Sequence, residues 1–279
     1  MENIITAEQI DAYCLSLLAD ERSAGTISKY RRDLTAFARW LGGRAVTKET
    51  AAGWKAHLLN HGYAPRTVNS MLAAVNGFCR FAGLPIKLKF LSIQRQIFRD
   101  SAKELTKEEY DRLLTAARES DQERLALIME TLCATGIRVS ELRYITVEAA
   151  LAGRATITLK GKIRTILLPA KLCRKLLKYA KKQKTASGEI FLTKSGRPIT
   201  RRQVWFELKR LCRAAGVEPT KVFPHNLRHL FATTFYRACR DIVRLADMLG
   251  HSSIDTTRIY LMVSGTEQQR QLDRLGLVS

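Results

Sequence analysis

The chain has 279 residues, of which 46% are apolar and 26% charged, so it is long enough to form two ordinary globular domains or one large one. This composition argues against disordered, collagen-like and disulfide-scaffold proteins. The 47 Lys and Arg residues against 26 Asp and Glu give a net charge of +21, which indicates a polyanionic partner, either nucleic acid or an acidic membrane surface.

The first 83 residues predict a bundle of four amphipathic helices, because apolar residues recur at helical spacing between capping and stop signals. A Ser or Thr followed three residues later by a residue that can bond back to it marks a helix start, and so does a Pro in the first turn. The predicted start signals, in chain order, are Thr6 with Gln9, Thr26 with Ser28, Thr47 with Thr50, and Pro65.

A domain boundary is predicted between this bundle and the rest of the chain. Residues 84–104 show no clean period and mix basic with apolar residues, and a new capping signal follows at Thr106. The sequence therefore predicts a first domain over residues 1–95, a linker over 96–104 and a second domain over 105–279.

The second domain predicts helices around one β-hairpin. Residues 155–159 and 164–168 are rich in β-branched residues and flank Lys160-Gly161-Lys162, which indicates an antiparallel hairpin with a basic tip. The expected fold is therefore mainly α with a small antiparallel β-sheet. The other predicted elements are helices over 107–118, 121–135, 140–145, a segment opened by Pro169, 200–215, 224–238, 241–249, 256–263 and 267–275, and a short strand over 189–192.

Neither membrane insertion nor secretion is signalled. No apolar run approaches the roughly 20 residues that a membrane-spanning helix needs, and the first ten residues are polar and acidic. The six cysteines occur singly, without the paired spacing of structural zinc sites, which favours reduced thiols in a cytosolic protein.

Positive charge is concentrated in residues 154–213, which hold 18 basic residues and only two acidic ones, a net charge of +16. A short basic run is usually a solvated face or a flexible tail. Because this run is interrupted by ordered apolar spacing, we expect a folded surface that faces phosphates.

Two short stretches place guanidinium groups beside other polar side chains. Arg138 follows a helix stop, and Glu141 lies three residues on, within reach of its guanidinium. An isolated pair of this kind is most often a surface salt bridge. His225 and Arg228 are also three residues apart, so one helix face presents both an imidazole and a guanidinium.

A third stretch contains His251, followed nine residues later by Tyr260. Each alone has a simpler interpretation, His251 as a loop residue and Tyr260 as a core aromatic. A zinc site at His225 and His229 is disfavoured, because the motif lacks the glutamate of the H-E-x-x-H pattern and carries an arginine instead.

Taken together and in this order, these residues resemble the tyrosine recombinases, the family of phage integrases and Xer-type recombinases. The segments ATGIRVSEL, PHNLRHLFAT and LGHSSIDTTRIY are similar to its signature sequences. The resemblance covers the whole chain and implies an N-terminal helical core-binding (SAM-like) domain followed by a catalytic domain, as in Xer-like or transposon-type integrases. The order Arg, Lys, His-x-x-Arg, His, Tyr is matched by Arg138, Lys160, His225, Arg228, His251 and Tyr260.

The chemistry that these side chains suit can be stated from their types. A phosphodiester repels nucleophiles through its negative oxygens, and the charged planar forks of Arg138 and Arg228 suit clamps on those oxygens. Tyr260 is the candidate nucleophile, and its phenol, with a free pKa of about 10, needs help to lose its proton. His225 is the candidate base, and His251 is expected to add a third contact to the phosphate.

The resemblance also implies a proton donor and a cofactor-free reaction. Lys160 would protonate the leaving 5′-oxygen, although Lys162 shares the hairpin tip and stays an alternative, and Glu141 would hold Arg138 in place. The product would be a 3′-phosphotyrosyl link that retains the energy of the phosphodiester bond. Rejoining would then need no ATP, metal or other cofactor.

The implied partners are double-stranded DNA with inverted half-sites and further copies of this chain. A homo-tetramer on two DNA sites is expected, with residues 267–275 docking on a neighbouring protomer, and a cytoplasmic, nucleoid-associated location without a membrane. The alternatives are strand relaxation of the type IB topoisomerase kind and a non-catalytic DNA-binding regulator on the same fold. Candidates to enter the major groove are Arg201, Arg202, Gln203 and Lys209.

Overall fold

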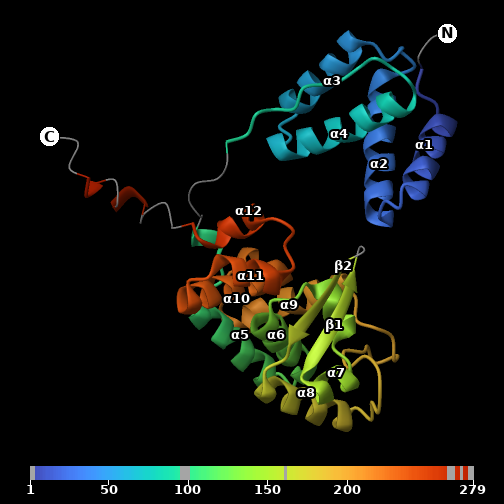
Figure 1. Cartoon of the computed structure of the whole chain (residues 1–279). Helices are drawn as coiled ribbons and strands as arrows, with labels where there is room; N and C mark the ends of the chain where they lie inside the picture. The colour runs from blue at the N-terminus through green and yellow to red at the C-terminus, as the bar shows by residue number, and fades with distance from the viewer. Residues whose placement is uncertain (1–3, 95–100, 160–161, 263–267, 271–272, 276–279) are drawn as a thin grey trace. The chain divides into compact units, whose positions relative to one another are not determined.

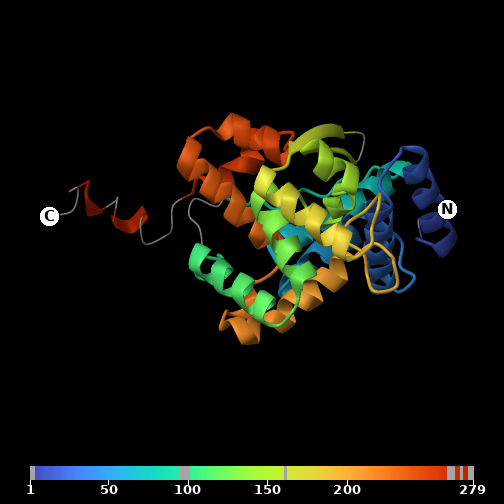
Figure 2. The same ribbon diagram turned by 90° about the horizontal axis from the view of Figure 1, so that it is seen from below.

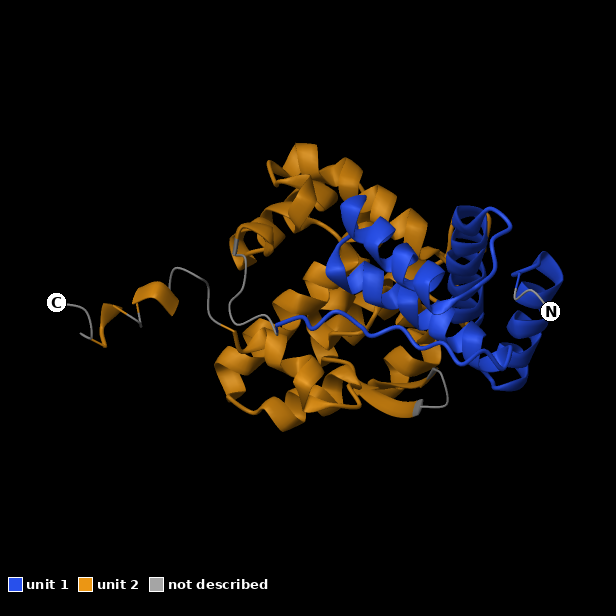
Figure 3. Cartoon of the chain, turned by 90° about the horizontal axis from the view of Figure 1, so that it is seen from above, with its two compact units in different colours: residues 1–95 blue, residues 96–279 orange. Residues whose placement is uncertain are grey.

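The computed structural model describes residues 4–94, 101–159, 162–262, 268–270 and 273–275. The chain divides into two compact units, Met1–Arg95 and Gln96–Ser279, which Figure 3 shows in different colours. Both are built mainly of helices, and unit 2 contains a two-stranded antiparallel sheet, which confirms the predicted fold class. Among the described residues, no helix is long and apolar enough to cross a membrane.

The described residues of unit 1 form four helices, which are drawn from blue to cyan in Figure 1. The predicted capping boxes at Thr6 and Thr47 are present. The second helix starts earlier than predicted, because the hydroxyl of Ser23 accepts the amide hydrogen of Thr26 at 3.3 Å and caps the helix there. The helices are α1 (Ala7–Ala19), α2 (Ala24–Leu41), α3 (Lys48–Asn60) and α4 (Pro65–Phe81).

The segment after α4 is fastened to that helix by two asparagine side chains. The amide group of Asn76 donates to the carbonyl of Leu88 at 3.0 Å and accepts from its N–H at 2.8 Å. Asn69 makes the same pair of hydrogen bonds with Leu91, at 2.9 and 2.7 Å. Each asparagine side chain thus bonds both the N–H and the C=O of one residue, as a neighbouring strand would. This segment therefore belongs to unit 1 although it has no regular secondary structure.

Unit 2 is organised around α6, whose residues Leu125, Ile128, Met129 and Leu132 are almost fully buried. Helix α10 packs against it. The longer helices are α5 (Lys107–Glu119), α6 (Glu123–Thr135), α8 (Ala170–Lys182), α9 (Arg201–Ala215), α10 (Pro224–Cys239) and α11 (Ile242–Leu249). The shorter elements are η1 (Ser101–Lys103), η2 (Val139–Tyr144), α7 (Val147–Ala152), η3 (Pro219–Lys221), α12 (Ile254–Thr257) and η4 (Arg258–Tyr260).

The hairpin of unit 2 consists of β1 (Arg154–Leu159) and β2 (Lys162–Leu167), beside α7 at one edge of the unit (Figures 1 and 2). Leu159 pairs with Lys162, so the second strand begins two residues before the predicted start. The predicted strand over 189–192 is wrong, because Glu189 and Leu192 form only isolated bridges, with Thr146 and Pro198.

The segment around Tyr260 also differs from its prediction. Instead of one helix over 256–263, α12 begins at Ile254 behind the capping hydroxyl of Ser253, and the chain tightens into the 3₁₀ turn η4. Such a turn is common where a helix ends. Of the helix predicted over 267–275, residues 268–270 are helical, and 267, 271 and 272 lie outside the described residues.

Candidate active site

Arg138 is placed by the sharp end of α6. Gly136 ends that helix in the left-handed conformation (φ 65°), and Arg138 two residues later precedes the first residue of η2. The carboxylate of Glu141 accepts the backbone N–H of Arg138 at 2.7 Å and its Nη1 at 3.2 Å. Glu141 is 1% exposed whereas the side chain of Arg138 is 42% exposed. The buried carboxylate therefore fixes a guanidinium whose head reaches solvent.

Arg228 lies inside the unit, on the first turns of α10, and is 2% exposed. Its Nη1 donates to the carbonyl of Gly136 at 2.5 Å and its Nη2 to the carbonyl of Leu249 at 2.7 Å. Burial lowers the pKa of this guanidinium to about 10, and the charge of Arg138 contributes to the shift. Arg228 is thus a charged group at neutral pH that joins the end of α6 to the end of α11.

His251 is held in its neutral form by two hydrogen bonds. Its Nε2 lies 3.0 Å from Nη2 of Arg228, and since a guanidinium can only donate, Nε2 accepts. The hydrogen is therefore on Nδ1, which donates to the hydroxyl of Thr257 at 2.8 Å. Burial, followed by the charges of Arg228 and Arg138, lowers the pKa of His251 to about 4.

Tyr260 lies behind these groups and is 3% exposed. Its ring stacks on His251 at a centroid distance of 6.3 Å and meets the edge of His229 at 4.9 Å. Burial raises the pKa of the phenol, and the charge and hydrogen bond of Arg228 act against that rise. The hydroxyl group is therefore beside one of the two predicted arginine clamps.

The histidine whose ring contacts the ring of Tyr260 from α10 is His229, and not the predicted base His225. His225 lies on the first turn of α10 with part of its surface open to solvent, and partial desolvation of its ring, followed by the charge of Arg228, lowers its pKa. His229, one turn further along, packs on the phenol, and its Nε2 lies 3.8 Å from a carboxylate oxygen of Glu104. Sequence reasoning used His229 only as a disfavoured zinc ligand.

Of the predicted site residues, Lys160 lies outside the described residues. The side chain of Lys162 is likewise not described, so neither lysine can be placed relative to the arginines. The same hairpin contributes Arg164 instead, which sequence reasoning missed. Its Nη2 donates to Glu141 at 2.8 Å, and its Nη1 donates to the carbonyl of Leu249.

A signal for Arg164 was present in the alternation of β2. Ile166 and Leu168 point inward and are buried, whereas Ile163 and Thr165 are exposed. Because alternate residues of a strand face the same side, Arg164 faces inward like Ile166. The strand therefore places a guanidinium at a position where an apolar side chain is expected.

A cavity of about 550 Å³ adjoins these groups, and its lining includes Arg138 and Arg164 as well as the carboxylates of Glu141 and Asp247. Arg228 does not line the cavity, but it lies close to Arg138, Arg164 and Glu141 and adds a third guanidinium charge beside it. The excess of fixed positive charge suits an anion such as a phosphodiester. The cavity is lined by Arg138, Glu141, Arg164, Gly250, His251 and Ser252, among others.

Two of the four side chains predicted to enter a DNA groove are already engaged on α9. Gln203 accepts the N–H of Thr200 at 2.9 Å as part of the helix cap, and Lys209 donates to the carbonyl of Pro219. Arg201 and Arg202 are exposed at the start of the helix. The two arginines are therefore better placed than Gln203 or Lys209 to reach a ligand.

Comparison with known families and proteins gives a consistent result over the whole chain. Residues 103–267 match the phage integrase family, and residues 10–83 match the phage integrase N-terminal SAM-like domain. The chain is 30% identical to the protein named tyrosine recombinase XerA of Pyrococcus furiosus, with 99% of this chain and 97% of that protein covered.

Solved structures share the fold at lower identity. XerH site-specific recombinase bound to its difH substrate in a pre-cleavage complex superposes with a TM-score of 0.70 at 19% identity, covering 95% of this chain and 84% of XerH. A lambda integrase tetramer bound to a Holliday junction gives a TM-score of 0.72 at 20% identity, covering 91% of this chain and 76% of that one.

Proposed function

Since this chain belongs to the phage integrase family of tyrosine recombinases, we propose that it is a site-specific DNA recombinase that cuts and rejoins strands through a 3′-phosphotyrosyl link to Tyr260. The observation that carries the proposal is the position of the Tyr260 phenol beside Arg228, in a unit whose cavity is lined by Arg138 and His251. A binding protein needs no such nucleophile within a cluster of positive charge.

The reaction follows from the charges of these groups. Arg138 and Arg228 hold the non-bridging oxygens of the scissile phosphate and offset their negative charge, which otherwise repels the incoming phenol oxygen. To bind phosphate, Arg228 exchanges some of its bonds to backbone carbonyls and its bond to His251, and the hydrogen of His251 moves from Nδ1 to Nε2, which then donates to the same oxygens. The bond from Tyr260 to phosphorus forms as the bond from phosphorus to the 5′-oxygen breaks.

Two protons move during this step. The proton of Tyr260 passes to His225, whose lowered pKa keeps its ring neutral at pH 7, as a base must be. A proton from Lys160 on the hairpin passes to the departing 5′-oxygen. The phosphotyrosyl ester retains the energy of the original bond, so a 5′-hydroxyl of another strand reverses the step without ATP or a metal.

The substrate is double-stranded DNA with inverted half-sites, which places the enzyme in the cytoplasm at the nucleoid. Unit 1 and the basic residues 154–213 bind the duplex, with Arg201 and Arg202 at the groove. XerH and lambda integrase are recorded on DNA, the latter as a tetramer, which supports this partner and a homo-tetramer on two sites.

The test begins with covalent capture, because the DNA site is undefined. Wild-type protein is incubated with duplexes of randomised half-sites that carry a nick near the centre, and DNA that stays attached after denaturation is sequenced. We expect a captured duplex with inverted repeats. Tyr260→Phe should bind this duplex with unchanged affinity and form no adduct.

Other outcomes point to the alternatives. No adduct from any duplex contradicts the proposal and favours a DNA-binding regulator. Relaxation of supercoiled plasmids that carry one captured site, without exchange between two sites, favours action of the type IB topoisomerase kind.

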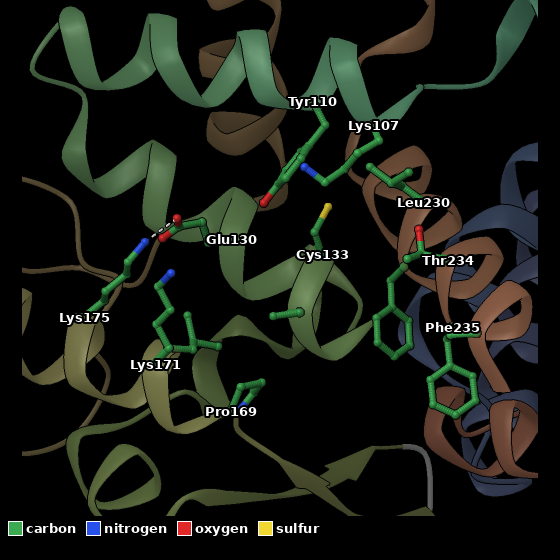
Figure 4. A pocket seen from close by; sticks show the side chains of 14 residues that line it. Lys107, Tyr110, Glu130, Cys133, Pro169, Lys171, Lys175, Leu230, Thr234 and Phe235 are labelled. Atoms are coloured by element: carbon green, nitrogen blue, oxygen red, sulfur yellow. Dashed lines mark hydrogen bonds and ion pairs between the residues drawn. The ribbon is translucent and has the colours of Figure 1, made fainter.

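Unit 2 also offers a pocket for the C-terminal segment of a neighbouring protomer. The pocket has a volume of about 520 Å³, within the usual range for ligand pockets. Figure 4 shows Leu230 and Phe235 of α10 and Pro169 near the start of α8 along its apolar wall, with Lys107 and Lys171 at its rim. Apolar side chains of residues 267–275 fit such a wall, and the lysines suit the acidic groups of that segment.

This docking is tested with Leu272→Asp, against Gln269→Asp as a control of equal charge change. Leu272→Asp should keep binding to one captured duplex and lose the complex of two duplexes with four protomers in sedimentation. An unchanged four-protomer complex would show that the segment does not join protomers.

A further inference from the structure

Arg164 is part of the interior of unit 2 rather than of its surface. Its side chain is 15% exposed, it pairs across the hairpin with Ile157, and Ile166 on the same face of β2 is buried. Its Nε atom is buried without a hydrogen-bond acceptor among the described residues. An arginine in such a place costs stability relative to an apolar residue, so its presence calls for a role.

Both bonds of Arg164 go to groups that the two clamping arginines also use. Its Nη2 binds Glu141, the carboxylate that holds Arg138. Its Nη1 binds the carbonyl of Leu249, to which Nη2 of Arg228 donates at 2.7 Å. Arg164 of the hairpin is thus linked to Arg138 through Glu141 and to Arg228 through the carbonyl of Leu249.

The backbone at the end of α11 is shaped to admit this guanidinium. Gly250 has a left-handed conformation (φ 64°), and a β-carbon at that position would overlap the guanidinium of Arg164. Only glycine meets both requirements without strain. The contact therefore depends on matched features of β2 and of the turn that leads to His251.

We propose that Arg164 is a positioning residue that fixes the hairpin, and with it the lysines of the hairpin tip, to the two arginine clamps. This inference rests on the proposed recombinase function. Arg164 lies on β2 only two residues after Lys162, where the strand begins, so fixing Arg164 fixes the end of β2 that leads to the tip. Proton delivery to the leaving oxygen is then coupled to correct placement of both clamps.

The role concerns the proton that reaches the 5′-oxygen as the phosphorus–oxygen bond breaks. An alkoxide leaves poorly without that proton, whereas a thiolate leaves well without it because a thiol is far more acidic. Replacing the bridging 5′-oxygen of the captured duplex by sulfur therefore removes the need for the hairpin lysine. It leaves the need for the arginine clamps unchanged.

The experiment measures single-turnover cleavage of the captured duplex with 5′-oxygen and with 5′-sulfur at saturating protein. Arg164→Gln should cleave the oxygen duplex about 100-fold more slowly than wild type, the size of effect that a misplacement of about 1 Å produces. It should cleave the sulfur duplex at nearly the wild-type rate. Lys160→Met should behave in the same way, and Arg164→Lys, which keeps one donor, should lie between.

Two controls accompany the test. Arg118→Gln removes the same charge from an exposed position of unit 2 that lies outside the basic residues 154–213, and it should change neither rate. Arg138→Ala should be slow on both duplexes, because its role precedes departure of the leaving group. The ratio of the sulfur rate to the oxygen rate does not depend on the fraction of folded protein, so it reports the effect on leaving-group departure even in a partly unfolded variant.

The inference is overturned if Arg164→Gln loses both rates equally, or if it loses neither. The proposed function fails in a different way, since wild-type protein would then form no adduct with any duplex. The two failures are therefore distinguishable in one set of measurements.

Discussion

His251 links the electrostatics of the site to the pH dependence of stability. Its pKa is lowered to about 4 in the folded protein, mainly by burial, against about 6.5 for an ordinary histidine. The unfolded chain therefore binds more protons than the folded one between these values. The stabilising contribution of neutral His251 is complete above pH 6.5 and is lost as the pH falls toward 4.

We therefore expect the melting temperature of the wild type to fall more between pH 7.5 and pH 5 than that of His251→Gln. Glutamine can still accept from Arg228 and donate to Thr257, but it does not titrate. Thermal unfolding at pH 7.5, 6 and 5 measures the difference. Parallel melting curves for the two proteins across this range would contradict the neutral state assigned to His251.

At the residue scale, the sequence indicated which side chains gather at the candidate site better than it indicated which partners they contact. Arg138, Arg228, His251 and Tyr260 belong to stretches whose order stands out, and the structure brings them together. Arg164 was missed, because its partners are 23 residues away and, at Leu249, 85 residues away. The alternation of β2 marks Arg164 as facing inward, but local spacing does not identify partners so far along the chain.

At the element scale, two glycines that end helices allow backbone strain to be distinguished from side-chain crowding. Gly136 and Gly153 end α6 and α7 with nearly the same left-handed conformation, φ 65° and 67°. A β-carbon on Gly136 would overlap the ring of Phe231, whereas one on Gly153 would meet no atom within 4 Å. The first position therefore combines backbone strain with crowding, and the second has backbone strain alone.

We expect Gly153→Ala to lower the free energy of unfolding by about 1 kcal/mol, the usual cost of a left-handed alanine. Gly136→Ala should lower it by about 3 kcal/mol, since overpacking adds about 1 to 3 kcal/mol. Urea denaturation of both variants measures the difference. Equal losses would mean that Phe231 moves aside freely.

The elements themselves were predictable where the signal is local. The capping boxes at Thr6, Thr47 and Thr106 mark helices that start where predicted, because each cap is formed by residues three apart. The predicted strand over 189–192 failed because a short apolar run has no period to distinguish a strand from a buried loop. The hydrogen bonds of Asn76 and Asn69 to Leu88 and Leu91 were not predictable either, because the partners are 12 and 22 residues apart in the sequence.

At the scale of the whole molecule, the net charge of +21 suits the DNA partner that we propose. Contacts to phosphates release bound counterions, so the logarithm of the association constant falls linearly with the logarithm of salt concentration. We expect binding of the captured duplex to weaken about 10³- to 10⁵-fold between 50 and 200 mM salt, as for about 6 to 10 phosphate contacts. Fluorescence anisotropy measures it, and a nearly flat response would exclude a phosphate-dominated interface.

The burial of Tyr260 bears on what the protein does between encounters with its site. A phenol enclosed by His229 and His251 is out of reach of a duplex that merely touches the surface. In the proposed reaction, a chance contact with DNA would leave the nucleophile covered, and binding of the correct site would supply the energy that uncovers it. Burial of the Tyr260 hydroxyl would in this way limit cleavage to the correct DNA site.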